Sequence, residues 1–539
     1  MSFDWLLPDR KRGLGFGLRC LAKLLQLSIA NCCRVSGRFQ WRGKTSELEN
    51  FHWKNYTFCG ARKIAQINGG IFLLRQDPFS LCFKTFSRFD EHSGKEHALL
   101  HEDSFDAILT AYPSSDGNAV IVNRRTDRNI TVWAFLMHNG QFKRVIEAKN
   151  DTEFFNVDHS EGKWIMSTNS ERFGANPLQK ECIFQSENRE SGNWNAVYIP
   201  SPQEELVEAT GSNFRMLYNL ETNKSRLEYS LAGKKHSIPL CSPASSIQIG
   251  SKFIMETTAT KVIVHCKSTG IKKYTQNFHQ NRYTQETIFT TANSIPITIL
   301  KLKNPTREST KNPHFALIDV YGSYGEIPRI SITPFIKDLL DGGFVYAFVH
   351  VRGGREKGWK WQTGAKGKVN SIKDAQEAIL HLCKSGYTSQ GKICIHGFSA
   401  GAVVAASVFG ANPQDFFAVV LDRPLLDVES LKKYAVQIPL SCSDVREFSI
   451  EACPMRWLKE ASNAEIMVNV MLKDQRVPFW NPLRWLLRSR QVGCRNAKLF
   501  LNLEGGHFDG KKNDQKKSAF VLEAMGKLDR PEGKMNQSL

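Results

Sequence analysis

Residues 392–409 read KICIHGFSAGAVVAASVF, and this stretch decides the fold of the second half of the chain. Its first part, residues 392–396, is a short apolar run typical of a β-strand, and its last part, residues 402–409, is a run of small residues typical of a helix. Ser399 lies between them, with a glycine two residues away on each side. The order of strand, sharp turn and helix predicts a strained backbone at Ser399 that exposes its hydroxyl above a sheet.

Two further residues, each placed after an apolar run, complete a catalytic pattern with Ser399. A serine nucleophile needs a histidine to take its proton and a carboxylate to hold that histidine in the correct tautomer. Asp474 follows the apolar run 466–472, and His507, the sole histidine beyond Asp474, follows the apolar run 499–503. Hydrolases with this type of turn place the acid and then the base after the serine, on loops beyond strand ends. On its own His507 is typical of a solvated loop, but the three residues together predict a triad.

The composition indicates a soluble globular protein of more than one domain. With 539 residues the chain exceeds the size of one ordinary core, and its 41% apolar and 23% charged residues are typical of a globular protein. No run approaches the roughly 18 apolar residues of a membrane span. The net charge of +19 is spread over the whole chain without a nucleic-acid-binding motif, so a solvated basic surface is favoured over a nucleic-acid site.

The thirteen cysteines are odd in number, irregularly spaced and without a C-x-x-C pair. This pattern indicates free thiols in a reducing compartment, and it argues against a disulfide framework and against structural zinc. We therefore predict a cytoplasmic protein without a metal or another cofactor.

Residues 1–49 form a basic segment in which no acidic residue occurs between Asp9 and Glu47. Lysines and arginines surround a helical run at residues 21–29, and two interpretations stay open. One is a mitochondrial-type presequence or an amphipathic helix at a membrane surface. The other is a basic helix that packs onto the body of the protein. The first interpretation would add peripheral membrane contact and a mitochondrial or Golgi association.

The rest of the chain divides at about residue 282. Residues 50–282 show short strand-like runs separated by polar turns, which predicts an all-β array such as a sandwich or a propeller with room for about five blades. Residues 283–530 alternate strand-like and helix-like runs, which predicts an α/β domain with a mostly parallel sheet covered on both faces. Residues 531–539 are interpreted as a tail.

Several motifs of the second half carry a family resemblance. They are VYGSYG at 320–325, VHVRGG at 349–354, the turn around Ser399, DQRVP at 474–478 and GGH at 505–507. Together they resemble the prolyl oligopeptidase family, and within it oligopeptidase B and the prolyl endopeptidase-like proteins. The resemblance covers about residues 283–525 and implies an α/β-hydrolase domain capped by a β-propeller. It also implies that Ser399 is the nucleophile, His507 the general base and then acid, and Asp474 the residue that orients His507.

The same resemblance implies roles for four residues beside the triad. The hydroxyl of Tyr321 and the N–H of Ala400 would bind the oxyanion of the reaction. Arg476 resembles the family's arginine that grips a carbonyl of the substrate backbone, and Val477 belongs to the same expected substrate-binding group. The alternatives are packing alone for Tyr321, as is common for a tyrosine at a strand end, and a surface charge for Arg476; the functional role is favoured for both.

Three departures from the family pattern bear on specificity. The stretch before residue 283 is short for the family's seven blades, so a reduced or incomplete propeller is expected. Residues 439–452 offer no tryptophan to stack on a proline ring, which argues against cleavage after proline. Where oligopeptidase B carries a pair of acids, this chain offers Asp444 and Arg446, and the like charge would repel a basic side chain.

These features lead to two hypotheses of function. The first is a serine hydrolase that forms an acyl-enzyme on short peptides, esters or thioesters, as the prolyl endopeptidase-like branch of the family would imply. The second is a hydrolase fold retained as an interaction scaffold in trafficking or signalling. Neither involves nucleic acid, and the sequence leaves open whether the chain is a monomer or a dimer.

Overall fold

The computed structural model describes residues 50–528 apart from short gaps. The gaps are 54–55, 60, 68–69, 78–82, 105–106, 127–129, 138, 150–152, 174–179, 188–193, 211–213, 250–251, 279–281, 305–313, 435–446, 475, 504 and 509–513. The basic segment 1–49, the tail 531–539, Asp444 and Arg446 lie outside the described residues, so the interpretations given to them stay predictions.

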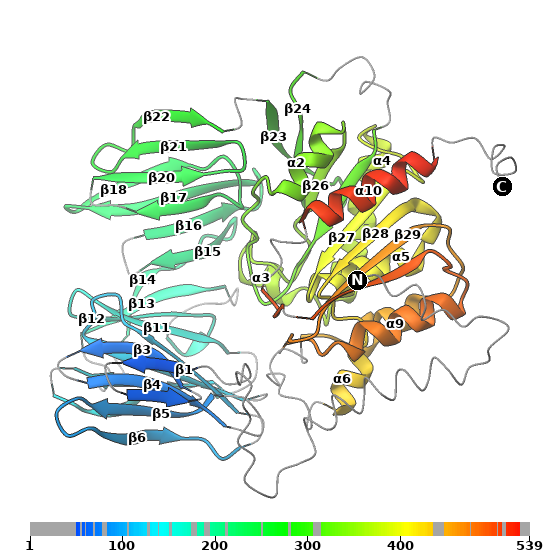
Figure 1. The fold of residues 1–539 in the computed structure, drawn as a ribbon. Helices are drawn as coiled ribbons and strands as arrows, with labels where there is room; N and C mark the ends of the chain where they lie inside the picture. The colour runs from blue at the N-terminus through cyan, green and yellow to red at the C-terminus, as the bar shows by residue number, and fades with distance from the viewer. Residues whose placement is uncertain are drawn as a thin grey trace, which may run out of the picture.

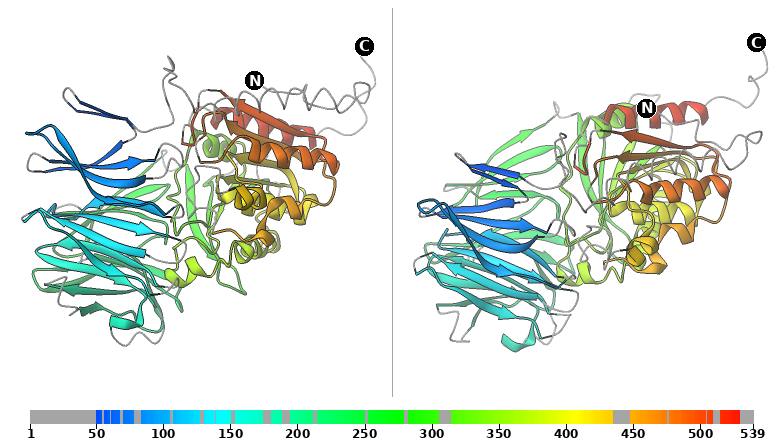
Figure 2. Two further views of the ribbon diagram at one scale, coloured as in Figure 1. Left: turned by 90° about the horizontal axis from the view of Figure 1, so that it is seen from below. Right: turned by 60° about the horizontal axis from the view of Figure 1, so that its bottom comes forward.

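The described chain forms a strand-rich part and a part that combines a sheet with helices, and the two lie side by side in all three ribbon views (Figures 1 and 2). The strand-rich part runs from β1 to β22, and the second part from β23 to the last helix, α10. β22 ends at Asn277 and β23 starts at Tyr283, on either side of the predicted division at residue 282.

The strand-rich part contains one two-stranded hairpin, β1–β2, and then five four-stranded antiparallel sheets among the described residues. Each sheet is built from four strands that are consecutive in the chain. The strands are β1 (Asn50–Trp53), β2 (Tyr56–Cys59), β3 (Ala61–Ile67), β4 (Gly70–Gln76), β5 (Phe83–Asp90), β6 (Lys95–His101), β7 (Ile108–Pro113), β8 (Ala119–Arg125), β9 (Ile130–Leu136), β10 (Phe142–Glu147), β11 (Phe155–Ser160), β12 (Lys163–Thr168), β13 (Cys182–Ser186), β14 (Asn195–Tyr198), β15 (Glu204–Thr210), β16 (Phe214–Asn219), β17 (Lys224–Leu231), β18 (Lys234–Pro239), β19 (Ser246–Ile249), β20 (Phe253–Thr257), β21 (Lys261–Cys266) and β22 (Lys272–Asn277).

Apolar side chains from neighbouring sheets of this part pack against each other. Leu227 and Tyr229 alternate along β17 with more exposed residues, and they pack with Ile254 of the next sheet. This period of two is what a strand with one buried face requires. The predicted all-β array is therefore confirmed, whereas closure of the five sheets into a propeller ring stays a prediction.

The second part is built around an eight-stranded sheet with the order β23-β24-β26-β25-β27-β28-β29-β30. β24 pairs antiparallel with β23 and β26, and every pair from β26 to β30 is parallel. The strands are β23 (Tyr283–Phe289), β24 (Pro296–Leu302), β25 (Ala316–Val320), β26 (Val345–Val349), β27 (Ile393–Phe398), β28 (Phe416–Asp422), β29 (Glu465–Met471) and β30 (Ala497–Asn502). The α-helices are α2 (Pro334–Asp341), α3 (Trp359–Thr363), α4 (Val369–Lys384), α5 (Gly401–Ala411), α6 (Val428–Tyr434), α8 (Pro454–Trp457), α9 (Trp480–Gln491) and α10 (Asp514–Leu528).

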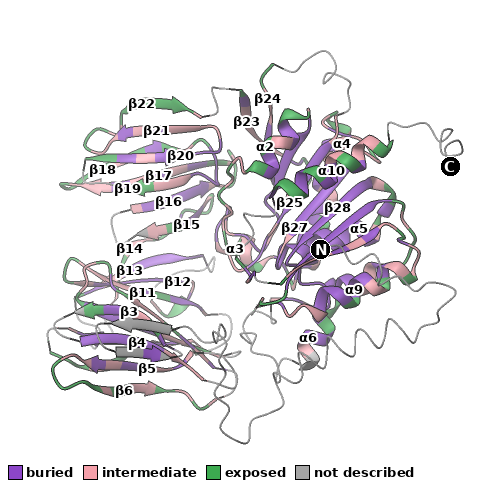
Figure 3. Cartoon of the chain, viewed as in Figure 1, coloured by how far each residue is buried: buried purple, intermediate pink, exposed green. Residues whose placement is uncertain are grey.

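Helices cover both faces of this sheet, as predicted. One apolar cluster joins one face of the strands to α4, α5 and α9, and a second joins the other face to α2 and α10. The inner strands β26, β28 and β29 are buried at every residue, and β28 appears purple in Figure 3. The small side chains of α5 let that helix be buried all round, from Gly401 to Gly410. The α/β-hydrolase fold class is confirmed.

The structure adds detail to the predicted alternation of strands and helices. Its first two strands, β23 and β24, form a hairpin joined by a turn at residues 290–295. β28 and the helices α9 and α10 had not been predicted. The apolar run FFAVVL at the start of β28 was nevertheless a readable strand signal.

Candidate active site

The turn at Ser399 joins the end of β27 to the start of α5, and its backbone is strained. Ser399 has φ of 52°, a left-handed value that is uncommon outside glycine. Its N–H donates to the backbone carbonyl of Asp422 over 3.0 Å. A Cβ at Gly397 would lie 2.8 Å from Cα of Ala402, and a Cβ at Gly401 would lie 2.5 Å from the carbonyl oxygen of Val320. Both flanking glycines are therefore required by the close approach of neighbouring backbone.

His507 lies between Ser399 and Asp474, although the three residues are far apart in the chain. Its Nε2 is 2.9 Å from Oγ of Ser399, and its Nδ1 is 2.7 Å from Oδ2 of Asp474. Only 4% of the His507 side chain and 2% of the Asp474 side chain are exposed. The distances fit an imidazole that donates from Nδ1 to the carboxylate and accepts the serine hydroxyl proton at Nε2.

The loop after β29 holds the second oxygen of Asp474. Oδ1 accepts hydrogen bonds from the N–H groups of Arg476, over 2.8 Å, and Val477, over 2.9 Å. The Val477 side chain is buried, and the residue contacts Asp474 through its backbone N–H group. Arg476 is exposed, and its guanidinium lies 5.2 Å from the ring centroid of Phe508. The substrate-binding roles of Arg476 and Val477 stay predictions.

Tyr321 and Ala400 both lie at the same turn. β25 pairs with β27 so that Val320 lies opposite Gly397, which brings Tyr321 to the turn. The Tyr321 ring packs against Gly401, and its Cδ2 would be 3.2 Å from a Cβ there. Ala400 is the N-cap residue of α5, where the partial positive charge of a helix N-terminus favours an oxyanion. Both residues are therefore near Ser399, and their predicted oxyanion roles stay predictions.

A buried ion pair fixes the loop that follows Tyr321. The Lys368 side chain is fully buried, donates to the carbonyl of Gly322 and lies 2.8 Å from Oε1 of Glu447. The same Oε1 accepts the N–H of Tyr324 over 2.6 Å. Burial lowers the pKa of Lys368, and the nearby Glu447 carboxylate opposes that shift. Sequence reasoning missed this pair, because neither residue lies in a motif that marks it.

Phe508 forms an exposed apolar rim next to the triad. Its ring is edge-on to the His507 ring at 5.0 Å, and 71% of the residue is exposed. Sequence reasoning did not assign it a role, although its position directly after His507 was an available signal.

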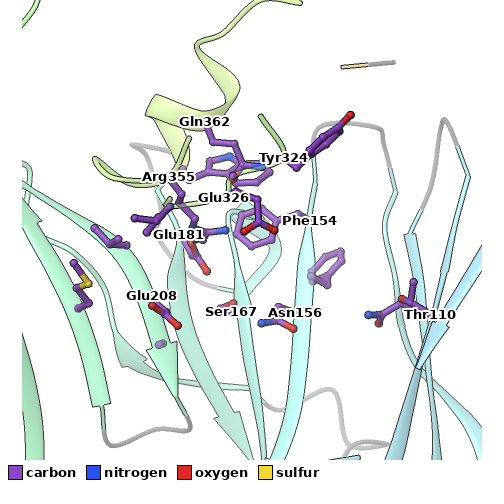
Figure 4. Close-up of a pocket in the computed structure, with 18 of the residues that line it drawn as sticks. Thr110, Phe154, Asn156, Ser167, Glu181, Glu208, Tyr324, Glu326, Arg355 and Gln362 are labelled. Carbon is purple, nitrogen blue, oxygen red and sulfur yellow. Dashed lines mark ion pairs between the residues drawn. The ribbon is translucent and has the colours of Figure 1, made fainter. Parts of the chain in front are cut away.

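A cavity of about 950 Å³ lies between the two parts of the molecule (Figure 4). Phe154 and Glu181, directly before β11 and β13, line it on one side, and Tyr324, Arg355 and Trp359 line it on the other. Arg355 points toward Glu181 and forms an ion pair with it, and burial lowers the pKa of Arg355 to about 10. Since Tyr324 comes three residues after Tyr321, the cavity adjoins the loop of the predicted oxyanion site.

Within the described residues, no group of three or more His, Cys, Asp or Glu side chains is arranged to hold a metal ion. Among the described helices, none has both the length and the apolar character needed to cross a bilayer.

Comparison with known proteins confirms the family resemblance. Residues 333–525 match the model of the prolyl oligopeptidase family. Dipeptidyl aminopeptidase BI of Pseudoxanthomonas mexicana is 26% identical over 303 residues, which cover 50% of this chain and 41% of that protein. The prolyl endopeptidase-like protein of Pongo abelii is 27% identical over 218 residues, which cover 38% of this chain and 29% of that protein. The chain thus spans less than half the length of either relative.

Solved structures extend the likeness to the strand-rich part. Oligopeptidase B from Leishmania major matches with a TM-score of 0.72 at 18% identity, over 87% of this chain and 72% of that one. At this level of identity the match shows a shared fold. It extends into the strand-rich part, because the sheet-and-helix part alone is too short to supply 87% of the chain.

Proposed function

We propose that this protein, whose residues 333–525 belong to the prolyl oligopeptidase family, is a serine hydrolase that forms an acyl-enzyme on short peptides, esters or thioesters. The observation that carries the proposal is the position of the His507 imidazole, 2.9 Å from the Ser399 hydroxyl and 2.7 Å from the Asp474 carboxylate. Nε2 is thus within hydrogen-bond reach of the hydroxyl whose proton it takes, and Nδ1 is within reach of the carboxylate that orients the ring. Neither contact requires a change of conformation.

In the proposed mechanism, Ser399 Oγ attacks the substrate carbonyl carbon while His507 takes the hydroxyl proton at Nε2. The Tyr321 hydroxyl and the Ala400 N–H stabilise the negative oxygen of the tetrahedral intermediate. His507 then gives its proton to the leaving group, and the acyl–Ser399 ester remains. A water molecule, activated by His507, hydrolyses this ester and releases the acid.

The proposed substrates are short because the described cavity lies between the two parts. A cavity of about 950 Å³ is of the size that takes a small ligand or a few residues of a peptide rather than a folded protein. Charged groups of both signs line it, including Glu181, Glu208, Arg329 and Arg355. We therefore propose substrates with polar ends and an acyl group that reaches Ser399.

A fluorophosphonate probe tests the proposal, because it reacts only with a serine that an adjacent base activates. We expect rapid labelling of the wild-type chain, no labelling of Ser399→Ala, and a residual labelling rate about 10³-fold or more below the wild type in His507→Ala. Ser407→Ala is the matched control, since this buried serine of α5 donates to the carbonyl of Ala452 and does not contact the triad. Absence of labelling in the wild type, or equal labelling in Ser399→Ala, would refute the proposed function.

A panel of acyl esters, thioesters and short peptides then identifies the substrate class. The proposal expects turnover of at least one of these classes by the wild-type chain and none by Ser399→Ala.

A further inference from the structure

Asp422 and Arg423, at the end of β28, contact both the nucleophile turn and the loop that carries His507. The Asp422 carbonyl accepts the Ser399 N–H over 3.0 Å. Arg423 Nη1 donates to the backbone carbonyl of His507 over 3.1 Å. One dipeptide is therefore bonded to the backbone of two members of the proposed triad.

The guanidinium of Arg423 is buried, and its environment fixes it. Only 7% of the residue is exposed, and Nη2 donates to Oδ2 of Asp422 over 2.7 Å. The guanidinium also lies 4.6 Å from the ring centroid of Phe398, which in turn packs 5.3 Å from the His507 ring. A buried cation with a carboxylate partner and an aromatic face has little freedom to move.

The backbone of Arg423 ties this residue to the strand that leads to the acid. Its N–H donates to the carbonyl of Asn469 in β29 over 2.8 Å, and β29 ends shortly before Asp474. Arg423 also adopts φ of 48°, a left-handed value that a non-glycine residue keeps only where the surroundings require it. The residue thus links the ends of β28 and β29 to the loop that carries His507.

The backbone of His507 needs such a partner. Asp474 and Ser399 hold the two ring nitrogens, but the ring position also depends on the main chain of a loop between β30 and α10. A buried carbonyl without a hydrogen bond is costly, and Arg423 satisfies the one at His507.

We propose that Arg423 is a positioning residue, which places the His507 imidazole for proton transfer by holding the His507 carbonyl. This inference rests on the proposed function and deepens it, because it assigns a role to a residue outside the triad. Arg423 itself does not touch the reacting atoms.

Lys517 of α10 provides a matched comparison. Its Nζ lies 3.2 Å from Oδ2 of Asp422, the same oxygen that Arg423 contacts, and it is also buried. Its described contacts are with Asp422, Asp514 and the Phe335 ring, and none is with the triad. Lys517→Met therefore removes a buried cation from Asp422 and leaves the hydrogen bond from Arg423 to the His507 carbonyl in place.

The test compares Arg423→Met, Arg423→Lys and Lys517→Met with the wild type, by steady-state hydrolysis of the best ester and by thermal unfolding. We expect Arg423→Met to lower kcat by about 100-fold with little change in KM, because a base displaced by about 1 Å costs that much. Arg423→Lys keeps a donor and should recover part of kcat. Lys517→Met should lose stability but keep kcat within about threefold of the wild type.

A double-mutant cycle with His507→Ala separates positioning from general damage. If Arg423 acts through His507, adding Arg423→Met to His507→Ala should not lower the residual fluorophosphonate labelling rate further. Independent, additive losses would overturn the inference, as would equal losses of kcat in Arg423→Met and Lys517→Met. If Arg423→Met fails to fold, the double-mutant cycle with His507→Ala is measured with Arg423→Lys in its place, and the same two outcomes decide the inference. In these outcomes the wild type is still labelled at Ser399, so the proposed function stands, whereas an unlabelled wild type overturns both.

Discussion

At the scale of single residues, three contacts of different chemistry fix the imidazole of His507. One ring nitrogen faces the Asp474 carboxylate, the other faces the Ser399 hydroxyl, and the main-chain carbonyl accepts from Arg423. In the proposed mechanism the first contact sets the tautomer, the second carries the proton and the third sets the position, so loss of each should have a different consequence.

Asp474→Asn should remove most of the activity while it preserves the shape of the site. The Arg476 and Val477 N–H groups need an acceptor, so they should select the amide oxygen of the new side chain. Its NH₂ group would then face Nδ1 of His507 and force the tautomer in which Nε2 carries the proton and accepts none. We expect kcat to fall about 10³- to 10⁴-fold in ester hydrolysis, with the melting temperature nearly unchanged. Activity within tenfold of the wild type would contradict this role of Asp474.

Phe508→Ala should weaken substrate binding rather than the chemical step. The ring is 71% exposed next to His507, where it offers apolar surface to a substrate bound at Ser399. We expect KM for apolar acyl esters to rise about tenfold, which corresponds to the loss of part of a buried phenyl contact, with kcat changed less. Phe253→Ala, at another exposed phenylalanine on β20, is the control and should leave KM unchanged. An unchanged KM in Phe508→Ala would exclude this role.

The sequence predicted those site residues that a local pattern marks. Ser399, Asp474 and His507 each follow an apolar run, and the structure brings their side chains together. Arg423 and Lys368 could not be found in this way. Their partners, the His507 carbonyl and Gly322 carbonyl, are backbone atoms distant in the chain, and no residue pattern announces such a contact.

At the scale of elements, the parallel strand order brings the loops of the site to one edge of the sheet. β25, β27, β28, β29 and β30 are neighbours in the sheet, and Tyr321, Ser399, Arg423, Asp474 and His507 follow them. Apolar runs predicted most of these strands, because strands buried on both faces are almost continuously apolar. α9 and α10 were not predicted, since both carry many charged residues and cover the sheet with a partly polar surface.

Lys368→Met should destabilise the link between the loop after β25 and the segment before α8. The change removes a fully buried cation and leaves Glu447 next to an apolar side chain. We expect a loss of about 2 to 3 kcal/mol in the free energy of unfolding, measured in urea, because the Glu447 carboxylate, only 20% exposed, is left uncompensated. Activity should fall as well, since the Gly322 carbonyl beside Tyr321 loses its donor.

The double variant Lys368→Met with Glu447→Gln tests the cause of that loss. The amide of the new residue keeps an acceptor for the Tyr324 N–H but carries no charge. It should therefore recover part of the stability. A single variant as stable as the wild type would show that the buried pair contributes nothing.

At the scale of the whole molecule, a short segment around α3 joins the two parts. Arg355 pairs with Glu181, and the Trp359 ring lies 4.0 Å from that of Phe154. The Lys357 ammonium, in the second part, lies 5.7 Å from the centroid of the Tyr218 ring of β16, in the strand-rich part. The sequence predicted both parts, but it could not predict this contact. Such pairs join side chains more than a hundred residues apart, and they follow neither the helical nor the strand period.

The contact between the parts should make the stability of the protein depend on pH above neutrality. Burial lowers the pKa of Lys357 to about 8, and the Lys357 ammonium lies 4.5 Å from the Trp361 ring and 3.1 Å from the Ser294 carbonyl. An unfolded lysine has a pKa of about 10.4. Below pH 8 both states hold the proton, so the cost of burying the charge is constant.

Between about pH 8 and 10 the folded protein has released this proton and the unfolded chain still binds it. The free energy of unfolding contributed by Lys357 must therefore rise with pH in this window, by at most about 1.4 kcal/mol per pH unit. Lys357→Met buries no charge at this position, so it should be more stable than the wild type at pH 7. This difference in the free energy of unfolding should shrink from pH 8 to pH 9.5. Urea unfolding at several pH values measures the difference, with Lys360→Met, at an exposed lysine of α3, as the matched control. A difference between wild type and Lys357→Met that stays constant from pH 7 to pH 9.5 would show that the Lys357 charge is not buried at the contact between the two parts.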